Sequence, residues 1–404
     1  MKDIKKKVSS STKKPIYMDN TINIVSPSTI INYSTNLLER QKKITYGKEI
    51  MLNILNTNKD NYSIFFTCGI DESNNLILTS CVNSFKKIKK VIPHVVISSV
   101  ESYSLLKYAN SLKESGNIEL TILKGNAYGC IMSTDIITHL KENTCLVMIS
   151  YINPKTGSVN NVNKISQILH ERNIPLHSDC LYLFGNHTLD LSSNNIDSVS
   201  LSFDRINAPS GIGILAVRNP LLDGYRLKDH SSLFESNTCN GNVELLQFSI
   251  KLLVDKLKDR KLKNKKLLSY RNQIIECLGK KCQILTFANF MKTDEAPLTE
   301  DTNHMNKLII LGPPIDNVAY YTPSILSFII MTKKNIDNIT IKKKLENHNI
   351  FICNTINNSY DDSFYNDIGI PSDAKKYIIR LSINDNITSD NIKFFIKIFM
   401  NVAF

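Results

Sequence analysis

Short apolar runs alternate with helix-like segments along most of this 404-residue chain, and this alternation limits its fold more than any other feature. The runs are rich in β-branched residues, which is typical of buried strands. Each segment between them is long enough to cross from one parallel strand to the next. The pattern therefore predicts an α/β fold with a mainly parallel central sheet and helices on both faces. We expect strands at 63–67, 94–98, 120–123, 145–150, 175–178, 198–202 and 212–217, and helices at 103–114 and 164–171.

A lysine-rich helical pattern over 244–278 follows these runs and predicts a bridge to a second domain. We expect a basic flexible tail at 1–14, a large domain at 15–260, and a smaller α+β domain at 261–404, against which residues 15–26 can pack. With 42% hydrophobic residues, the chain can bury two cores of this size. The second domain should contain strands at 307–311, 325–331, 350–353 and 377–383, and helices near 339–347 and 389–402.

The net charge of +12 keeps open a role in binding nucleic acid or packing a virion. Asn, Ile and Lys are abundant, as in proteins from AT-rich genomes, so we interpret some of the lysine excess as codon bias and the lysine clusters as solvated faces and a disordered tail. No stretch approaches the roughly 18 apolar residues of a membrane helix, and the N-terminus lacks the apolar core of a signal peptide. The nine cysteines show no metal-like spacing. We expect an intracellular, cytoplasmic protein without disulfides or a metal.

Several segments, taken in order, resemble the cysteine desulfurases (NifS-like proteins) of the class V aminotransferase superfamily, which are fold-type I pyridoxal-phosphate enzymes. Their collinear order at strand ends makes the resemblance specific for the fold. It implies a fold-type I architecture and a homodimer. The matching segments are 15–20 (Pro-Ile-Tyr-Met-Asp-Asn), 66–75 (Phe-Thr-Cys-Gly-Ile-Asp-Glu-Ser-Asn-Asn), 100–102 (Val-Glu-Ser), 152–157 (Ile-Asn-Pro-Lys-Thr-Gly), 177–180 (His-Ser-Asp-Cys), 200–213 (Ser-Leu-Ser-Phe-Asp-Arg-Ile-Asn-Ala-Pro-Ser-Gly-Ile-Gly), 236–238 (Ser-Asn-Thr) and 378–382 (Ile-Ile-Arg-Leu-Ser).

Arg205 stands where the resemblance implies the lysine that forms a Schiff base with the cofactor. A guanidinium stays protonated near neutral pH and is a poor nucleophile, so arginine cannot replace that lysine. The alignment is fixed by the matching residues on both sides, and no lysine lies between Lys164 and Lys228. We therefore expect no Schiff base at position 205.

The phosphate pocket implied by the resemblance has become acidic. Asp71 replaces a threonine, and Asp204 replaces the histidine before the lysine. A carboxylate close to a phosphate repels it by roughly a few kcal/mol. Ser202 and Thr238 remain as cofactor-binding remnants, although ordinary strand-end and loop roles explain them equally well. Arg205 is expected to offset the acids by pairing with Asp204, Asp71 or Asp179.

The positions that the resemblance assigns to the pyridine ring are also altered. Ser102 replaces the stacking histidine and supplies neither a ring nor a base that titrates near pH 7. Pro154 falls on an asparagine position, where the neighbouring Asn153 could substitute only after a local shift, and Tyr182 replaces a glutamine. Asp179 matches the partner of the ring nitrogen, yet we favour a role as a turn hydrogen bonder.

Two further positions concern the substrate. The sulfur-carrying cysteine of the family aligns near Asn357 or Asn358, while Cys353 ends an apolar strand pattern. We interpret Cys353 as a core or strand-end residue, with a reactive thiol as the alternative. Arg380 matches the arginine that binds the substrate carboxylate, and it marks either a retained anion site or a structural ion pair.

Together these changes predict a pseudoenzyme: a NifS-like protein without Schiff-base or desulfurase chemistry that acts as a binding or structural component, with no cofactor expected. The alternatives are a pyridoxal-phosphate enzyme with an altered site, in which the cofactor binds non-covalently, and a basic protein for nucleic acid or virions. Degenerate NifS-like proteins with this composition resemble those of large DNA viruses, so we expect a viral source.

Overall fold

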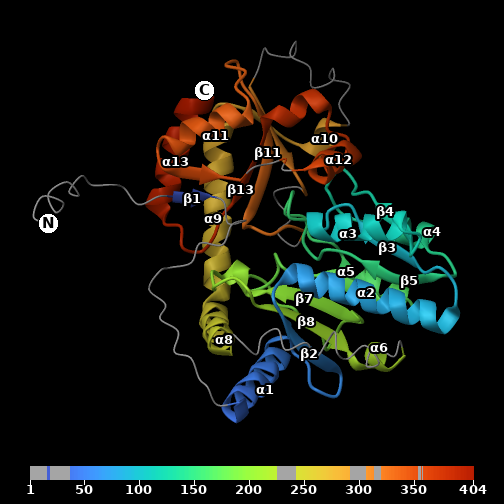
Figure 1. Ribbon diagram of the computed structural model, residues 1–404. Helices are drawn as coiled ribbons and strands as arrows, with labels where there is room; N and C mark the ends of the chain where they lie inside the picture. Colours follow the sequence, from blue (N-terminus) through green and yellow to red (C-terminus); the bar gives the residue numbers. More distant parts are fainter. Residues whose placement is uncertain are drawn as a thin grey trace, which may run out of the picture.

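The computed structural model describes residues 16–18, 37–224, 243–291, 306–313, 320–353, 356 and 358–404. These residues form two halves, each built around its own sheet (Figure 1). We call the half that contains the seven-stranded sheet the large domain and the half that contains the four-stranded sheet the small domain. No helix in the described part of the chain is long and apolar enough to span a membrane.

The large-domain sheet has the strand order β2-β8-β7-β6-β5-β3-β4. Strand β8 runs antiparallel to both of its neighbours, and the other pairs are parallel. The predicted fold class is therefore confirmed, and the strands lie within a few residues of their expected positions. The strands are β2 (Tyr62–Thr67), β3 (His94–Ser98), β4 (Glu119–Leu123), β5 (Thr144–Met148), β6 (Leu176–Asp179), β7 (Ser198–Ser202) and β8 (Gly213–Arg218).

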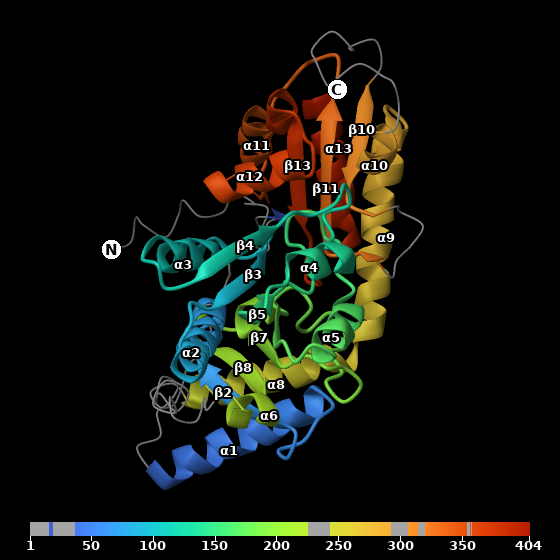
Figure 2. The ribbon, with the colours of Figure 1, turned by 90° about the vertical axis from the view of Figure 1, so that its right-hand side faces the viewer.

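Helices cover both faces of this sheet (Figure 2). Val95 and Ile97 belong to a core with α2 and α3, whereas Val96 belongs to the core on the opposite face with α1, α5 and α8. Because both faces are buried, β3 and β5 are largely apolar runs, whereas β6 and β7 also bury polar side chains such as His177 and Ser200. The helices are α1 (Leu37–Ile54), α2 (Ile70–Lys89), α3 (Tyr103–Glu114), α4 (Ser133–His139), α5 (Val162–His170), α6 (Asn219–Gly224) and α8 (Val243–Lys258), with a 3-10 helix, η1, at Phe203–Ile206.

The small-domain sheet has the order β13-β11-β10-β9 and is also covered on both faces. Leu308 and Ile310 point into a core with α9, α11 and α13, and Ile309 and Leu311 point into a core with α10 and α12. Beside this sheet, β1 (Ile16–Met18) pairs with β12 (Ile350–Ile352). The other elements are α9 (Arg260–Gly279), β9 (Gln283–Thr286), α10 (Phe287–Phe290), β10 (Lys307–Leu311), β11 (Ile325–Met331), α11 (Asn338–Glu346), α12 (Ser359–Asp367), a 3-10 helix (Ser372–Tyr377), β13 (Ile378–Ser382) and α13 (Ser389–Ala403).

The bridging segment is two helices, whereas the sequence pattern predicts one. Helix α8 ends at Lys258 and α9 begins at Arg260, because the chain turns at Asp259 from the base of the large domain to run along the small domain (Figures 1 and 2). Asp385, just after β13, fixes this turn: its carboxylate lies 3.2 Å from Lys256 Nζ and 3.9 Å from Lys263 Nζ. Tertiary contacts therefore override a helical pattern that continues through the break.

Candidate functional site

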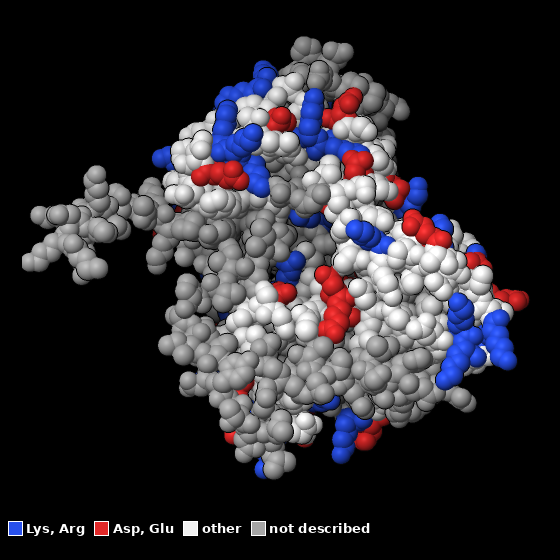
Figure 3. Space-filling view, viewed as in Figure 1, with Lys and Arg blue, Asp and Glu red and all other residues white. Residues whose placement is uncertain are grey.

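Most of the sequence-predicted site residues lie at the edge of the large-domain sheet where the parallel strands end. Asp71 follows β2 in the first turn of α2, Ser102 caps α3 after β3, Asp179 ends β6, and Arg205 follows β7 in η1. Ligand sites of parallel α/β sheets form at this edge. Arg380 comes from β13 of the small domain. Between the two domains, Figure 3 shows a hollow in which acidic and basic side chains gather.

Arg205 is held against an aromatic ring. Its Nη2 atom donates a hydrogen bond to the Tyr182 hydroxyl at 2.7 Å, and its guanidinium carbon lies 4.1 Å from the centre of the Tyr182 ring. Stacking of this kind is a property of guanidinium that a lysine ammonium does not reproduce. The sequence predicts that Arg205 pairs with Asp204, Asp71 or Asp179, and it does not predict the contact with Tyr182. The two positions that replace the family's lysine and glutamine therefore interact with each other.

Asp179 lies at the centre of a buried polar network. Its Oδ2 accepts a hydrogen bond from Asn74 Nδ2 at 2.9 Å, and its Oδ1 accepts one from the Leu181 backbone at 2.9 Å. Asn74 Oδ1 lies 3.0 Å from Nε2 of His177, whose pKa burial lowers to about 3, so this histidine is neutral. Burial raises the pKa of Asp179, and the charge of Arg205 opposes that rise. The network fixes the Asp179 carboxylate at the end of β6.

Glu101 is a second buried carboxyl, which we did not single out from the sequence. Its side chain accepts hydrogen bonds from the Ser98 hydroxyl at 2.5 Å and from the backbone and hydroxyl of Ser150 at 2.5 and 2.8 Å. Burial, with the Asp179 carboxylate nearby, raises the pKa of Glu101 to about 7. The site thus contains two neighbouring acids that resist ionising together. A glutamate three residues after the end of a buried strand was the available signal.

Asp71 is bound by the start of the neighbouring helix. Its Oδ1 accepts hydrogen bonds from the hydroxyls of Ser102, at 3.3 Å, and Ser104. Ser102 also caps α3 by accepting from the Leu105 backbone at 3.3 Å. A carboxylate near two helix N-termini is stabilised by their partial positive charge. Donors that could serve a phosphate at this place are therefore already bound to Asp71.

The other predicted phosphate positions are bound mainly to the backbone. Ser202 Oγ donates to the Ile212 carbonyl at 3.3 Å and accepts from the Asp204 backbone at 3.5 Å. Asp204 has one buried carboxylate oxygen without a hydrogen-bond partner in the described residues, and burial raises the pKa of its carboxyl. Thr238 lies outside the described residues.

Asn153 is used within its own loop. Its Nδ2 donates to the Gly129 carbonyl at 2.8 Å, and its Oδ1 accepts from the Lys155 backbone at 2.8 Å. Lys155 itself is buried, and its Nζ lies 3.2 Å from Asp361 Oδ1 of α12. No local pattern predicts a buried lysine here, because an Asn-Pro-Lys-Thr-Gly turn is typical of an exposed loop.

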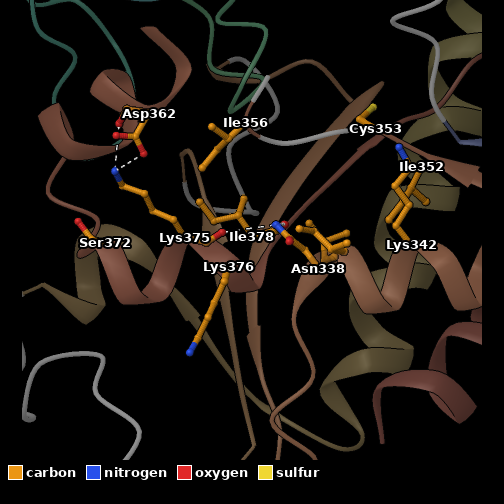
Figure 4. A pocket seen from close by; sticks show the side chains of 12 residues that line it. Asn338, Lys342, Ile352, Cys353, Ile356, Asp362, Ser372, Lys375, Lys376 and Ile378 are labelled. Atoms are coloured by element: carbon orange, nitrogen blue, oxygen red, sulfur yellow. Dashed lines mark hydrogen bonds and ion pairs between the residues drawn. The ribbon is translucent and has the colours of Figure 1, made fainter. Parts of the chain in front are cut away.

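Arg380 and Cys353 lie together in the small domain. Both are buried, and Cys353 is among the groups near the Arg380 guanidinium that raise its pKa. Cys353 also lines a pocket of about 340 Å³, in which Lys375 binds Asp362 (Figure 4). Near the expected sulfur-carrying position, Asn358 caps α12 by accepting from the backbones of two following residues, at 3.0 and 2.9 Å. Asn357 lies outside the described residues.

Comparison with known proteins assigns the family. The sequence model described as "Aminotransferase class-V" matches residues 28–241, more than half of the 404 residues. The chain belongs to the class-V aminotransferase family. Among similar members, the cysteine desulfurase IscS of Plasmodium falciparum is 31% identical over 180 residues, which is 45% of this chain and 32% of that protein. The mitochondrial cysteine desulfurase of Saccharomyces cerevisiae is 29% identical over 234 residues, which is 52% of this chain and 46% of that protein. The alignments thus span less than half the length of these two relatives.

Solved structures show the same fold for this class-V aminotransferase family member. A NifS-like protein superposes with a TM-score of 0.73, covering 96% of this chain and 99% of the other at 17% identity. The cysteine desulfurase of Thermococcus onnurineus NA1 superposes with a TM-score of 0.72, covering 96% of this chain and 94% of the other at 15% identity. The resemblance to NifS-like proteins is therefore confirmed, and at these identities the superpositions establish the fold.

The comparisons contradict the expectation that no cofactor is used, because the cysteine desulfurases of this family are pyridoxal-phosphate proteins. That expectation rested on the changes at the lysine, ring and phosphate positions taken together. The described residues fit the group in part: the Asp179 carboxylate, fixed at a strand end, suits a pyridine ring nitrogen. A covalent bond at position 205 does not fit, because Arg205 has no nucleophilic amine.

Proposed function

We propose that this class-V aminotransferase family member no longer carries out desulfuration or transamination and acts as a non-catalytic binding or structural component. The observation that carries this proposal is the contact between Arg205 and Tyr182, which places a stacked guanidinium at the family's lysine position. A chance Lys-to-Arg change would leave a charged side chain without a matching partner. Here the partner position has changed too, which supports a rebuilt site.

The sulfur-transfer step supports the same proposal through a separate part of the chain. A persulfide-forming cysteine must present a thiolate to the substrate on a mobile segment. Cys353 is instead buried beside Arg380, and Asn358 is engaged in capping α12. Desulfuration thus lacks both its amine and its sulfur acceptor at the positions where the family carries them.

Pyridoxal phosphate, when bound to a protein, supplies an electron sink for carbanion chemistry. In this chain Asp179 would hold the ring nitrogen of the cofactor, and the cofactor would not be bound covalently at position 205.

We also propose a homodimer, supported by the family resemblance. The buried cores fall mainly on one side or the other of residue 260, with Ile325 and Val100 as the exceptions, which supports the division into domains at 15–260 and 261–404.

Sulfide release tests the proposed function. The purified full chain is incubated with pyridoxal phosphate, L-cysteine and a thiol reductant, and sulfide is measured against a protein-free control. We expect no sulfide above that control from the wild type. Sulfide released by the wild type in proportion to protein concentration would overturn the proposal.

Arg205→Lys is the matched variant, because it restores the family's amine without changing the charge. We expect it to release no sulfide either, because the sulfur acceptor and the phosphate donors are still missing. Circular dichroism confirms that the variant is folded. Release by this single variant would show that Arg205 alone blocks the chemistry, contrary to the proposal.

A further inference from the structure

Lys155 crosses from the large domain into the small domain. Only 4% of the residue is exposed, and its Nζ lies 3.2 Å from Asp361 Oδ1 and 5.2 Å from the centre of the Phe364 ring. Its backbone carbonyl accepts a hydrogen bond from Ser327 Oγ of β11 at 2.5 Å. Lysine is almost never fully buried unless it is paired, and here the acidic partner comes from the other domain.

The side chain of Arg380 lies on the side of the small-domain sheet that faces the Lys155 loop. Ser327 and Arg380 are directly opposite each other in the antiparallel pair of β11 and β13. Residues directly opposite each other in such a pair project from the same face of the sheet. Since Ser327 Oγ bonds to the Lys155 carbonyl, the Arg380 side chain also projects toward the loop that carries Lys155. The amine and the guanidinium therefore share one side of the small-domain sheet.

The hydroxyl of Tyr365 is a third polar group beside Lys155 and Arg380. Tyr365 of α12 is fully buried, and its hydroxyl has no hydrogen-bond partner in the described part of the chain. It is close enough to Arg380 and Asp361 to interact with their charges. Leaving a buried hydroxyl unpaired costs about 1–3 kcal/mol, so a ligand oxygen is a natural missing partner.

The protonation states of the group suit a reactive amine. Burial lowers the pKa of Lys155, and Arg380 acts in the same direction, while Asp361 and Glu101 oppose the change. A lowered pKa increases the fraction of neutral, nucleophilic amine. Glu101, with a pKa of about 7, interacts with this charge and can give or take a proton near neutral pH.

We propose that Lys155 captures carbonyl groups and that Lys155, Arg380 and Tyr365 form a site for small 2-oxo acids. Arg380 and Tyr365 donate hydrogen bonds to the carboxylate of the ligand. The ammonium of Lys155 releases one proton to solvent and its nitrogen adds to the ketone carbon. The carbonyl oxygen then leaves as water with the two protons that remained on the nitrogen, which gives an imine. No oxidant or reductant is required, because amine and ketone give only imine and water. The site is independent of position 205 and goes beyond the proposed function.

Borohydride trapping tests the site with pyruvate as the probe. The folded full chain is incubated with pyruvate and cyanoborohydride, and the modified lysine is located by peptide mass spectrometry. We expect one carboxyethyl group, on Lys155, and none at that position in Lys155→Arg. Lys375→Arg is the matched control, because Lys375 is also buried in an ion pair, 2.6 Å from Asp362, but away from this group. That variant should still be labelled at Lys155.

Replacing pyruvate by acetone, which lacks the carboxylate, should slow labelling of Lys155 about tenfold or more if a charged hydrogen bond to Arg380 is lost. An unlabelled Lys155 in the wild type, or labelling spread evenly over surface lysines, would refute the site. Equal labelling by acetone and pyruvate would refute the role of Arg380. The measurement uses neither cysteine nor pyridoxal phosphate, so its failure is distinct from a failure in the sulfide assay.

Discussion

The buried carboxyl of Glu101 makes a quantitative prediction about stability. Its pKa rises from 4.5 to about 7 on folding, mainly through burial. The folded protein therefore keeps this proton at pH values where the unfolded chain has released it. Such a group stabilises the folded state below the unfolded pKa, and the contribution is lost as the pH rises through the folded pKa. Between about pH 5 and about pH 8 this group alone should lower the free energy of unfolding by about 2 to 3 kcal/mol.

Glu101→Gln removes the titration while keeping the shape of the side chain. The amide oxygen can still accept from Ser98 and the Ser150 backbone, as the carboxyl does now. The charged neighbours Asp179 and Lys155 are present in both proteins, so their titration largely cancels in the difference. The buried histidines, which act in the opposite direction, cancel in the same way.

Urea unfolding of both proteins at several pH values measures this difference. We expect the variant to gain stability relative to the wild type as the pH rises, by the amount given above. Glu119→Gln is the control, because Lys141 and Asn143 hold the pKa of this exposed carboxyl below its usual value and its removal cannot produce the same trend. A stability difference between Glu101→Gln and the wild type that does not change with pH would refute the reasoning.

Two core substitutions test the packing around the site. Phe203→Ala removes a fully buried ring that lies 5.6 Å, centre to centre, from that of Phe184, and it should lower the free energy of unfolding by about 3–5 kcal/mol in urea titration; a loss below about 1 kcal/mol would contradict this packing. Gly213→Ala would place a methyl group 2.5 Å from Thr67 Oγ1 and 2.6 Å from the Gly69 backbone, so β2 and β8 must separate. We expect a loss of about 1–3 kcal/mol for this variant, and unchanged thermal unfolding would show that the two strands are not so close.

Much of the fold could be predicted from the sequence, because strands such as β3, β5 and β8 are buried on both faces and are largely apolar runs. The break between α8 and α9 at Asp259 could not be predicted. It depends on contacts with Asp385, which comes from a distant part of the chain. The place of the site was also predictable. Asp71, Ser102, Asp179 and Arg205 follow or end the strands β2, β3, β6 and β7, which run in one direction and end at one edge of the sheet.

The contacts within the site were less predictable than its location. Tyr182 and Arg205 lie on different loops, and only their side-chain conformations decide whether they stack. Lys155 is buried because α12 and β11 of the small domain close over its loop, and no local pattern around the Asn-Pro-Lys-Thr-Gly turn reports this. Sequence patterns report the local environment well, whereas these contacts depend on packing between the two domains.

The antiparallel strand β8 has a consequence for how the protein is made. In the described sheet β2 pairs only with β8, which is synthesised long after it. While the chain emerges from the ribosome, the apolar side chains of Ile64 and Phe66 must therefore wait for residues 213–218 before β2 can join the sheet. The same pairing brings the loop with Asp71 beside the loop with Arg205. The large-domain part of the site is thus assembled where the last strand of that sheet is added, and a nascent chain stopped before β8 would present an unpaired strand to chaperones and proteases.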